Sequence, residues 1–404
     1  MALDELLPAD HRARVVWRYV DSLDLSALYS RIQAVEGKAG RDAVDPKILM
    51  ALWMFATIEA VSSARQVARL CERDLAYMWI CGDVGVNHHL LSDFRTAHGA
   101  FLDQLLTDTI ATLMHQGLVT LEVVAQDGMR VRANAGGSSF RRQKTLEKLR
   151  EEAREHVRKL REESENESEN PSGDARRKEA RKRAASEREQ RVEKALEELV
   201  GLQQHKEKRK KGTGKQARCS TTDPDARTMK MGDGGFRPGY NVEFASDGAS
   251  RVILSVDVTN CGSDSGQMSP MHENVIERYG RAPDHYLVDG GFATVGDITE
   301  VEKRGSQVLA PIRDEEKMRE KGVDPHARGP KDTDEMFRFR QRMATPQAKE
   351  LYKQRPSIAE YPNAECRNRG LTQFRVRGLE KVRTVSLWYA ITINFMRMLN
   401  LGCL

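Results

Sequence analysis

Two acidic residues stand where the chain is otherwise apolar or turns sharply. Asp127 lies inside an alternating apolar stretch, residues 121–133, and Asp289 ends a short apolar run that is followed by Gly290 and Gly291. A carboxylate inside an apolar strand is costly to bury unless it is paired or binds a cation. Strand-end acids followed by glycines lie where open α/β sheets place their ligands. If the two strands are parallel neighbours, both carboxylates emerge at one edge of the sheet.

A third acid, Glu360, lies in a late polar segment, residues 352–360. Carboxylate oxygens without nearby His or Cys favour Mg²⁺. Two such ions, held about 3.5–4 Å apart, stabilise the attacking and leaving oxygens in phosphoryl transfer. The pattern therefore predicts metal-dependent phosphoryl transfer. The competing interpretation is that three of the 60 acids lie at element ends by chance.

The elements that must position these acids form a mixed α/β core. A turn signal, Asp247-Gly248, separates two apolar runs and predicts a β-hairpin. Apolar periodicity predicts the remaining elements. The predicted strands are 121–133, 240–244, 252–258, 285–289 and 307–312, and the predicted helices are 267–279, 298–303 and a C-terminal helix at 388–399.

Residues 11–117 have helical patterns. Asp45-Pro46 and Ser63 are predicted helix starts, Ser92 is predicted to cap a third helix, and Gly117 is predicted to stop it. Arginines occupy polar positions of these short helices, at 65, 69, 73 and 95. They favour either a helix-turn-helix-like DNA module or a helical bundle with solvated arginines.

Charge is concentrated in an interruption between the first two strands. Residues 141–211 hold 23 Lys+Arg and 17 Asp+Glu, with leucines at helical spacing on either side of a polar stretch, residues 166–173. This pattern predicts two charged helices that fold back on each other. Its basic end, residues 206–211, is either a solvated face or a contact for phosphate.

The rest of the composition is that of an ordinary protein. The net charge is +5, and the longest apolar run, residues 48–58, is far shorter than the roughly 18 residues of a membrane span. The first ten residues carry acids and no apolar stretch typical of a secretory signal. The six cysteines are scattered, without a Cys-x-x-Cys pair. We expect a cytoplasmic protein without a membrane partner or structural zinc.

Several blocks of the chain resemble the DDE transposases of bacterial insertion sequences. These blocks are residues 44–49 and 89–95 near the N-terminus, 127–136 around Asp127, 221–227 and 236–241 before the hairpin, 288–292 around Asp289, and 359–371 around Glu360. The resemblance implies an RNase H-like mixed sheet with a charged helical insertion, preceded by an all-α domain. It implies a helical DNA-binding domain over 1–118, a catalytic domain over 119–404 and an insertion over 141–215.

The resemblance also implies site residues. Asp127, Asp289 and Glu360 match the metal-binding triad, with Mg²⁺ as the cofactor and Mn²⁺ as its substitute. Tyr352 and Arg355 match a tyrosine-arginine-glutamate-lysine signature, in which Arg367 replaces the lysine. Rival acids are Glu365 for the third position and Asp257, Asp264 and Asp284 for the second.

The implied reaction is DNA cleavage at the ends of an insertion sequence and strand transfer into target DNA. The implied partner is double-stranded DNA, both terminal inverted repeats and target, and joining two ends implies a homo-oligomer. Basic residues near the triad are expected to hold the DNA backbone. The expected DNA-binding residues are Tyr352 and the basic residues Arg355, Arg367, Arg369, Arg375 and Arg377, whereas Arg130 and Arg132 either face DNA or form a solvated edge. The alternatives are an inactive transposase-derived DNA-binding protein and a nuclease that cuts without joining.

Overall fold

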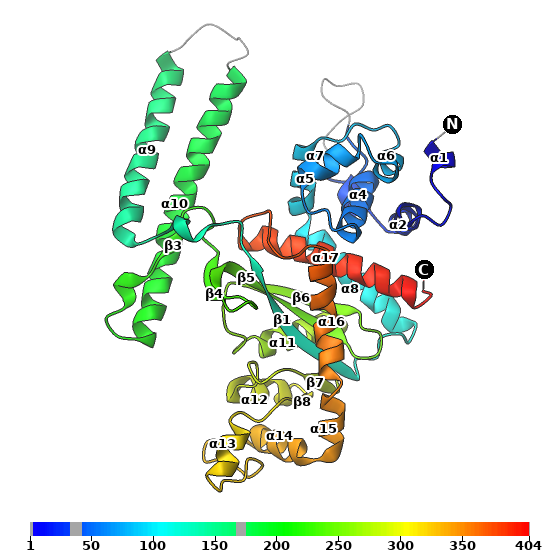
Figure 1. Ribbon diagram of the computed structural model, residues 1–404, viewed down its shortest axis with the longest axis vertical. Coiled ribbons are helices and arrows are strands. Elements are labelled where there is room, and N and C mark those ends of the chain that lie inside the picture. Colours follow the sequence, from blue (N-terminus) through cyan, green and yellow to red (C-terminus); the bar gives the residue numbers. More distant parts are fainter. Residues whose placement is uncertain (1–2, 33–42, 167–174, 404) are drawn as a thin grey trace.

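The computed structural model describes residues 3–32, 43–166 and 175–403. Figure 1 shows a helical N-terminal part, a central sheet and a long helical hairpin that stands beside them. The helices of the N-terminal part are α1 (Leu3–Leu6), α2 (Arg12–Asp21), α3 (Ser26–Tyr29), α4 (Pro46–Ile58), α5 (Ala64–Leu70), α6 (Leu75–Cys81), α7 (His88–Ala97) and α8 (Gly99–His115). Helix α4 is apolar and almost wholly buried, so it forms the core of this part.

Most of the predicted helix starts are confirmed. The side chain of Asp45 accepts a hydrogen bond from the Lys47 amide, and that of Ser63 accepts one from the Gln66 amide. The prediction for Ser92 is wrong, because Asn87 caps this helix and Ser92 lies inside it. The Asn87 side chain accepts from the amides of His89 and Leu90, which satisfies donors at the start of α7.

The polar arginines of these helices separate into two kinds. Arg65, Arg69 and Arg73 are exposed around α5, as both interpretations of the sequence require. Arg95 is buried: its guanidinium lies 4.5 Å from the centre of the Trp53 ring and donates to the Ser62 carbonyl at 2.7 Å. The expectation that Arg95 occupies a polar surface position is therefore wrong, because a cation–π contact and a backbone acceptor hold it in the core.

The central sheet is mixed and has the strand order β4-β5-β1-β7-β8, with β6 also paired to β5. Its strands are β1 (Val123–Arg132), β4 (Arg227–Lys230), β5 (Phe236–Asp247), β6 (Ile253–Thr259), β7 (His285–Leu287) and β8 (Gln307–Leu309). The pairs β6–β5 and β5–β1 are antiparallel, whereas β1–β7 and β7–β8 are parallel. This RNase H-like order confirms the predicted mixed sheet and places Asp127 on the central strand.

Helices cover both faces of the sheet and connect it to the rest of the chain. They are α11 (Met268–Tyr279), α12 (Val295–Lys303), α13 (Glu315–Glu320), α14 (Asp334–Ala344), α15 (Pro346–Tyr352), α16 (Arg355–Asn368) and α17 (Leu379–Asn400). Helix α16 contacts β1 and β5, and α11 contacts β5 and β6. Helix α17 contacts β6 as well as α4, α7 and α8, so it joins the N-terminal helices to the sheet (Figure 1).

One buried amide fastens α17 to the edge of the sheet. Asn394, which is 1% exposed, donates to the Ile253 carbonyl at 2.8 Å and accepts from the Ile253 amide at 2.7 Å. Ile253 belongs to β6, so the side chain of Asn394 pairs with this strand as a neighbouring strand would. The last helix is therefore part of the structure that holds the sheet.

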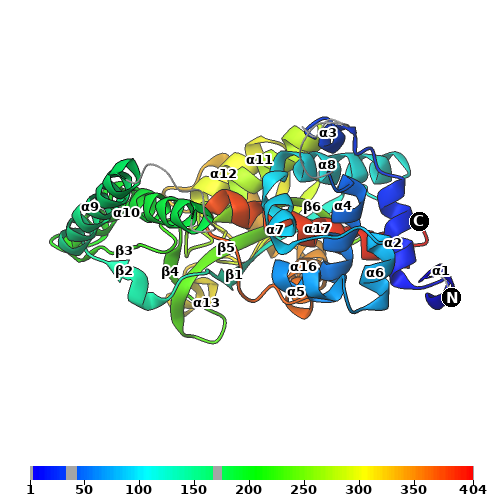
Figure 2. The same cartoon turned by 90° about the horizontal axis from the view of Figure 1, so that it is seen from above.

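The charged interruption forms the predicted hairpin of α9 (Gln143–Asn166) and α10 (Ala175–Arg209), seen from the side in Figure 1 and from above in Figure 2. Two short strands, β2 (Phe140–Arg141) and β3 (Cys219–Ser220), pair at its base, next to short 3₁₀ turns at Gly137–Ser139 and Gly214–Gln216. A small separate core lies there, formed by Leu146, Ala195, Leu199, Ala217 and Cys219. In the described residues, no helix is long and apolar enough to cross a membrane.

We predict that Asn394→Ala lowers the free energy of unfolding by about 2–4 kcal/mol. The substitution leaves the buried amide and carbonyl of Ile253 without partners, and each such group costs about 1–3 kcal/mol. Denaturant unfolding would measure the change. Asn400→Ala, at an exposed position of the same helix, is the control and should change stability by less than about 0.5 kcal/mol. Equal stability of the two variants would contradict this role of Asn394.

Candidate active site

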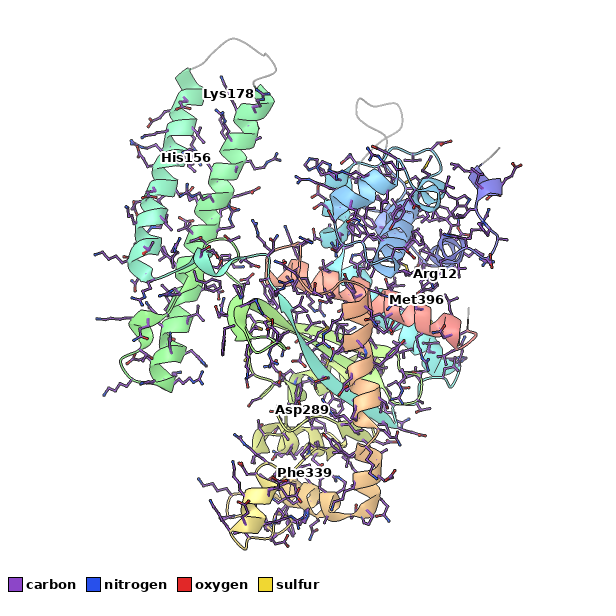
Figure 3. The ribbon with its side chains drawn as sticks, viewed as in Figure 1. Arg12, His156, Lys178, Asp289, Phe339 and Met396 are labelled. Atoms are coloured by element: carbon purple, nitrogen blue, oxygen red, sulfur yellow. The ribbon has the colours of Figure 1, made fainter. Side chains whose placement is uncertain are left out.

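The register of the parallel strands brings Asp127 and Asp289 together. Ala125 of β1 pairs with Leu287 of β7, and each aspartate follows two residues later. Asp127 remains within β1, whereas Asp289 lies just beyond β7, where its Oδ1 accepts the Gly291 amide at 2.7 Å. This register places the two carboxylates at one edge of the sheet, as the sequence predicted. Figure 3 labels Asp289 between the sheet and α12.

A single guanidinium lies against both carboxylates. Arg355, at the start of α16, places Nη2 3.2 Å from Oδ1 of Asp127 and 4.0 Å from Oδ2 of Asp289. The Arg355 side chain is 10% exposed, so its charge is compensated mainly by these two acids. Helix α16 contributes a second contact, because Asn363 donates from Nδ2 to Oδ2 of Asp127 at 3.0 Å.

Burial changes the acidity of Asp127. Desolvation raises its pKa to about 6, Arg355 lowers it and Asp289 raises it. Ionisation of Asp127 in the folded protein therefore costs free energy, and Arg355 offsets only part of this cost. A second cation at this position would stabilise the ionised form.

Glu360 lies on the same helix but does not touch the aspartate pair. Its side chain is exposed, and no hydrogen bond or ion pair of this side chain occurs within the described residues. Nor do the described residues contain three His, Cys, Asp or Glu side chains spaced to hold a metal ion. The structure thus brings together Asp127, Asp289 and Arg355, and leaves Glu360 apart from them.

Four other predicted site residues, Tyr352, Arg367, Arg375 and Arg377, are half-buried or exposed, and a fifth, Arg369, is paired with an acid. Tyr352 ends α15, half-buried, and burial raises the pKa of its hydroxyl. Arg367, Arg375 and Arg377 are exposed, and Arg377 donates to the Asn134 carbonyl at 3.2 Å. Arg369 is paired with Glu365, the rival third acid.

The rivals for the second acid also have partners of their own. Asp264 pairs with Arg130 at 3.1 Å, Asp284 pairs with Arg281 at 3.1 Å, and Asp257 lies 4.0 Å from Arg383. The guanidinium of Arg130 is therefore turned toward an acid of its own chain, so the alternative of a solvated edge is wrong, whereas a contact with DNA stays a prediction.

A buried polar network lies behind the aspartate pair, and the sequence analysis missed it. Glu243 of β5, 1% exposed, accepts from Gln126 at 3.2 Å and from Asn241 at 2.6 Å, and Asn241 also donates to Asp264. Burial raises the pKa of Glu243 to about 8. One signal was available, because Glu243 stands in an apolar strand as Asp127 does.

The network explains the glycine that follows Asp127. Gly128 pairs with Glu243 across the two strands. A Cβ at this position would lie 2.7 Å from Oε1 of Glu243 and 2.9 Å from Oδ1 of Asn241, closer than real Cβ contacts. A side chain at position 128 would displace the polar network and move β1, which carries Asp127.

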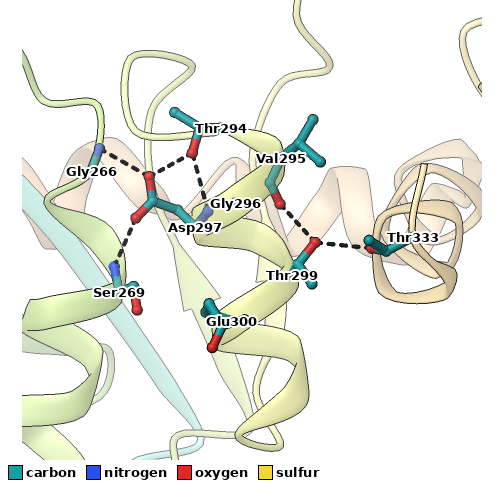
Figure 4. A pocket seen from close by; sticks show the side chains of 9 residues that line it. All are labelled: Gly266, Ser269, Thr294, Val295, Gly296, Asp297, Thr299, Glu300 and Thr333. Carbon is teal, nitrogen blue, oxygen red and sulfur yellow. Dashed lines mark hydrogen bonds between the residues drawn. The ribbon is translucent and has the colours of Figure 1, made fainter. Parts of the chain in front are cut away.

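Asp297 ties the loop after Asp289 to the loop before α11. Its carboxylate accepts from the amides of Gly266 and Ser269 and from the hydroxyl of Thr294, as Figure 4 shows. A hollow of about 460 Å³ lies beside it, between α12 and Thr333. Because Asp297 accepts amides at the start of α11 and also the hydroxyl of Thr294, the N-cap of α12, it connects the loop after Asp289 to the loop after Asp264.

We predict that Asp127→Asn stabilises the protein in the absence of divalent metal. At about pH 7.5 the ionised Asp127 is disfavoured in the folded state, so its removal should raise the free energy of unfolding by roughly 1–3 kcal/mol. Because the folded-state pKa of about 6 exceeds the ordinary value of 3.8, the gain should shrink as the pH falls through 6. Denaturant unfolding in EDTA at several pH values would measure it.

The matched control is Asp284→Asn, since Asp284 is half-exposed and lies outside the aspartate pair. We expect the control to change stability by less than about 0.5 kcal/mol at either pH. A loss of stability in Asp127→Asn at about pH 7.5 would contradict the assigned cost of ionising Asp127.

Two parts of the chain match known protein-family models. Residues 1–97 match a transposase domain (DUF772), and residues 202–395 match a transposase DDE domain, which includes Asp289 and α16. Asp127 and most of the hairpin lie between the two matched regions. Searches of curated proteins and of solved structures each found no match. With its RNase H-like sheet and these two matches, the chain belongs to the DDE transposases of insertion sequences.

Proposed function

We propose that this protein cleaves DNA at the ends of an insertion sequence and transfers the freed strands into target DNA. The observation that carries the proposal is the pairing of Asp127 and Asp289 at one edge of the sheet, against Arg355. In this reaction water attacks a phosphodiester at the end of the element and frees a 3′-hydroxyl. That hydroxyl then attacks a phosphodiester of the target. Neither step requires a nucleophile from the protein.

The residues present fit a hard divalent cation. Asp127 and Asp289 offer carboxylate oxygens where Arg355 already compensates part of their charge, and Oδ1 of Asn363 is buried with no partner among the described residues. We propose Mg²⁺, with Mn²⁺ as its substitute, held by Asp127, Asp289 and Glu360. The ion supplies Lewis-acid stabilisation of charge on the phosphate oxygens when it is bound.

Glu360 remains our choice for the third acid because of its place on α16. It precedes Asn363 by three residues, and side chains at this spacing are neighbours on a helix surface, with Cβ atoms about 5–6 Å apart. Asn363 itself touches Asp127. The rival, Glu365, has its carboxylate paired with Arg369.

The chain's own residues position the acids and the DNA. We propose that Asn363 fixes the orientation of the Asp127 carboxylate, and that Arg355 reduces the repulsion between the two aspartates. Tyr352 and Arg355 border the site, and Arg367, Arg369, Arg375 and Arg377 are proposed to hold the DNA backbone without reading its sequence. Of these arginines, Arg369 must share its charge with Glu365.

The remaining assignments concern the whole protein. We propose that residues 1–118 bind the terminal inverted repeats, with Arg65, Arg69 and Arg73 exposed for this purpose. Residues 119–404 would form the catalytic domain, with the insertion over 141–215. Joining two DNA ends requires a homo-oligomer. The proposed location is the bacterial cytoplasm, in association with the nucleoid.

We predict that Asp127→Asn, Asp289→Asn and Glu360→Gln each lower the rate of end cleavage by about 10³-fold, because each removes an oxygen ligand of the metal. A cleavage and strand-transfer assay on the element's ends, with Mg²⁺ and with EDTA, would measure the change. Binding to the ends should persist in all three variants. Asp284→Asn is the control and should cleave as the wild type does.

The outcomes separate the alternatives. End binding without cutting by the wild-type protein would favour an inactive, transposase-derived DNA-binding protein. Cutting without joining would favour a nuclease. Full activity in Glu360→Gln would show that the third acid is elsewhere, and Glu365→Gln would then be tested.

A further inference from the structure

The base of the helical hairpin carries an unbalanced concentration of positive charge. We call residues 206–218, the end of α10 and the turn that returns to β3, the basic knob. Seven of its thirteen residues are Lys or Arg, and Glu207 is its one acid. Arg141 of β2 pairs with Cys219, the residue that follows the basic knob, and Arg141, Arg142 and Lys144 are all exposed.

The one acid of the basic knob builds its turn. Glu207 accepts from the amides of Gly212 at 2.6 Å and Gly214 at 2.8 Å, and these bonds lower its pKa. Thr213 closes the same turn by donating to the carbonyls of Lys206 and Lys210. The basic knob is therefore a folded structure, in which Glu207 binds backbone amides and pairs with no knob cation in the structure.

The shaft of the hairpin is different. Residues 143–205 hold 16 Lys+Arg and 16 Asp+Glu, and some of these charges are paired, as when Arg154 of α9 reaches Glu189 and Glu193 of α10 at 3.8 and 2.9 Å. Within the described residues, none of the cations of the basic knob forms an ion pair, and Lys208 to Lys211 are all exposed. Balanced charge on the shaft and unbalanced charge on the basic knob indicate that the two surfaces serve different purposes.

The hairpin is fixed to the catalytic sheet. Lys194 of α10 pairs with Asp225 at 2.8 Å, and Asp225 also accepts the Leu379 amide at the start of α17. Glu198 of α10 pairs with Arg227 of β4. Figure 1 shows the lower end of α10 extending past β3, beside the edge of the sheet that β4 forms. A partner bound to the basic knob would thus be held in a set position relative to the sheet.

We propose that the basic knob binds the phosphate backbone of double-stranded DNA without reading its sequence. This inference rests on the proposed function and adds a contact outside the site and outside the N-terminal helices. Unpaired Lys and Arg side chains on a fixed support suit phosphate contacts. No large apolar side chain is exposed on the basic knob, so it lacks the apolar centre of a typical protein interface and the apolar face of a membrane-inserting helix.

The test is the salt dependence of binding by the full-length protein to a random-sequence DNA duplex. The variant carries Lys208→Gln, Arg209→Gln, Lys210→Gln and Lys211→Gln. We expect its affinity at moderate salt to fall by about 10-fold or more, and the slope of log K against log salt to shrink by roughly 2–3, since each lost phosphate contact contributes about 0.9. Circular dichroism and thermal unfolding should match the wild type.

Two matched variants are the controls. The first neutralises four exposed arginines of the shaft, by Arg177→Gln, Arg181→Gln, Arg183→Gln and Arg188→Gln, and should bind nearly as the wild type does. The second keeps the charge of the basic knob, by Lys208→Arg, Arg209→Lys, Lys210→Arg and Lys211→Arg, and should retain the wild-type slope.

The results distinguish this inference from the proposed function. Binding by the wild type with an unchanged slope in the neutralised variant would overturn the inference alone. An equal loss in the shaft variant would also overturn it, because the effect would then be one of net charge. Failure of the wild type to bind any duplex would overturn the proposed function together with the inference.

Discussion

Two carboxylates held side by side repel each other, and the structure depends on how that repulsion is balanced. The carboxylates of Asp127 and Asp289 each lie within 4.0 Å of one nitrogen of Arg355, so their nearest oxygens are at most about 7 Å apart. Two like charges at this distance cost roughly 2 kcal/mol in a partly buried environment. The guanidinium offsets part of that cost, while burial first and the charge of Asp289 second keep the pKa of Asp127 raised. The pair is therefore suited to receive additional positive charge.

Several elements far apart in the chain maintain this arrangement. The parallel pairing of β1 and β7 sets the register of the two aspartates, and α16 brings Arg355 and Asn363 against them. Behind β1, the network around Glu243 fills the space that a side chain at Gly128 would need. Helix α17 then fastens the sheet to the N-terminal helices through Asn394 and through Trp388, whose indole donates to the Arg95 carbonyl. The site is thus supported by elements on both sides of the long insertion.

The insertion interrupts the chain between β1 and the strands that pair with it, yet leaves the sheet intact. Its two ends are brought together by the pairing of β2 with β3 and by a small core around Leu199. Buried apolar side chains of both helices, Ala153 and Val157 of α9 and Ala185 and Val192 of α10, hold the shaft together, and Arg154 adds ion pairs between the helices. Lys194 and Glu198 connect α10 to Asp225 and Arg227. A charged hairpin of this kind can project from the body because its stability does not depend on covering the sheet.

Local chemistry explains which features were predictable from the sequence. Alternating apolar residues predicted β1, β5 and β6, the Asp247-Gly248 turn predicted their hairpin, and side-chain caps predicted α4 and α5. Ser92 failed as a helix start because Asn87, five residues earlier, satisfies the same kind of backbone donors. No element was predicted for residues 313–352, where α14 buries Met336, Phe339 and Met343 on one face and its Arg342 pairs with Glu302.

The sequence by itself determined the fold class, the charged hairpin and the candidate acids Asp127 and Asp289, because these depend on residue type and on spacing within one element. Tertiary structure decided the partners of those acids. Arg355 and Asn363 lie more than two hundred residues from Asp127, and Arg130 pairs with Asp264, 134 residues further along the chain. Strand register and helix packing create such contacts, and neither can be read from the order of residues within one helix or strand. Glu360 lies on α16 with Asn363 and Arg355. We propose that its carboxylate meets Asp127 and Asp289 when the metal ion and the DNA are bound.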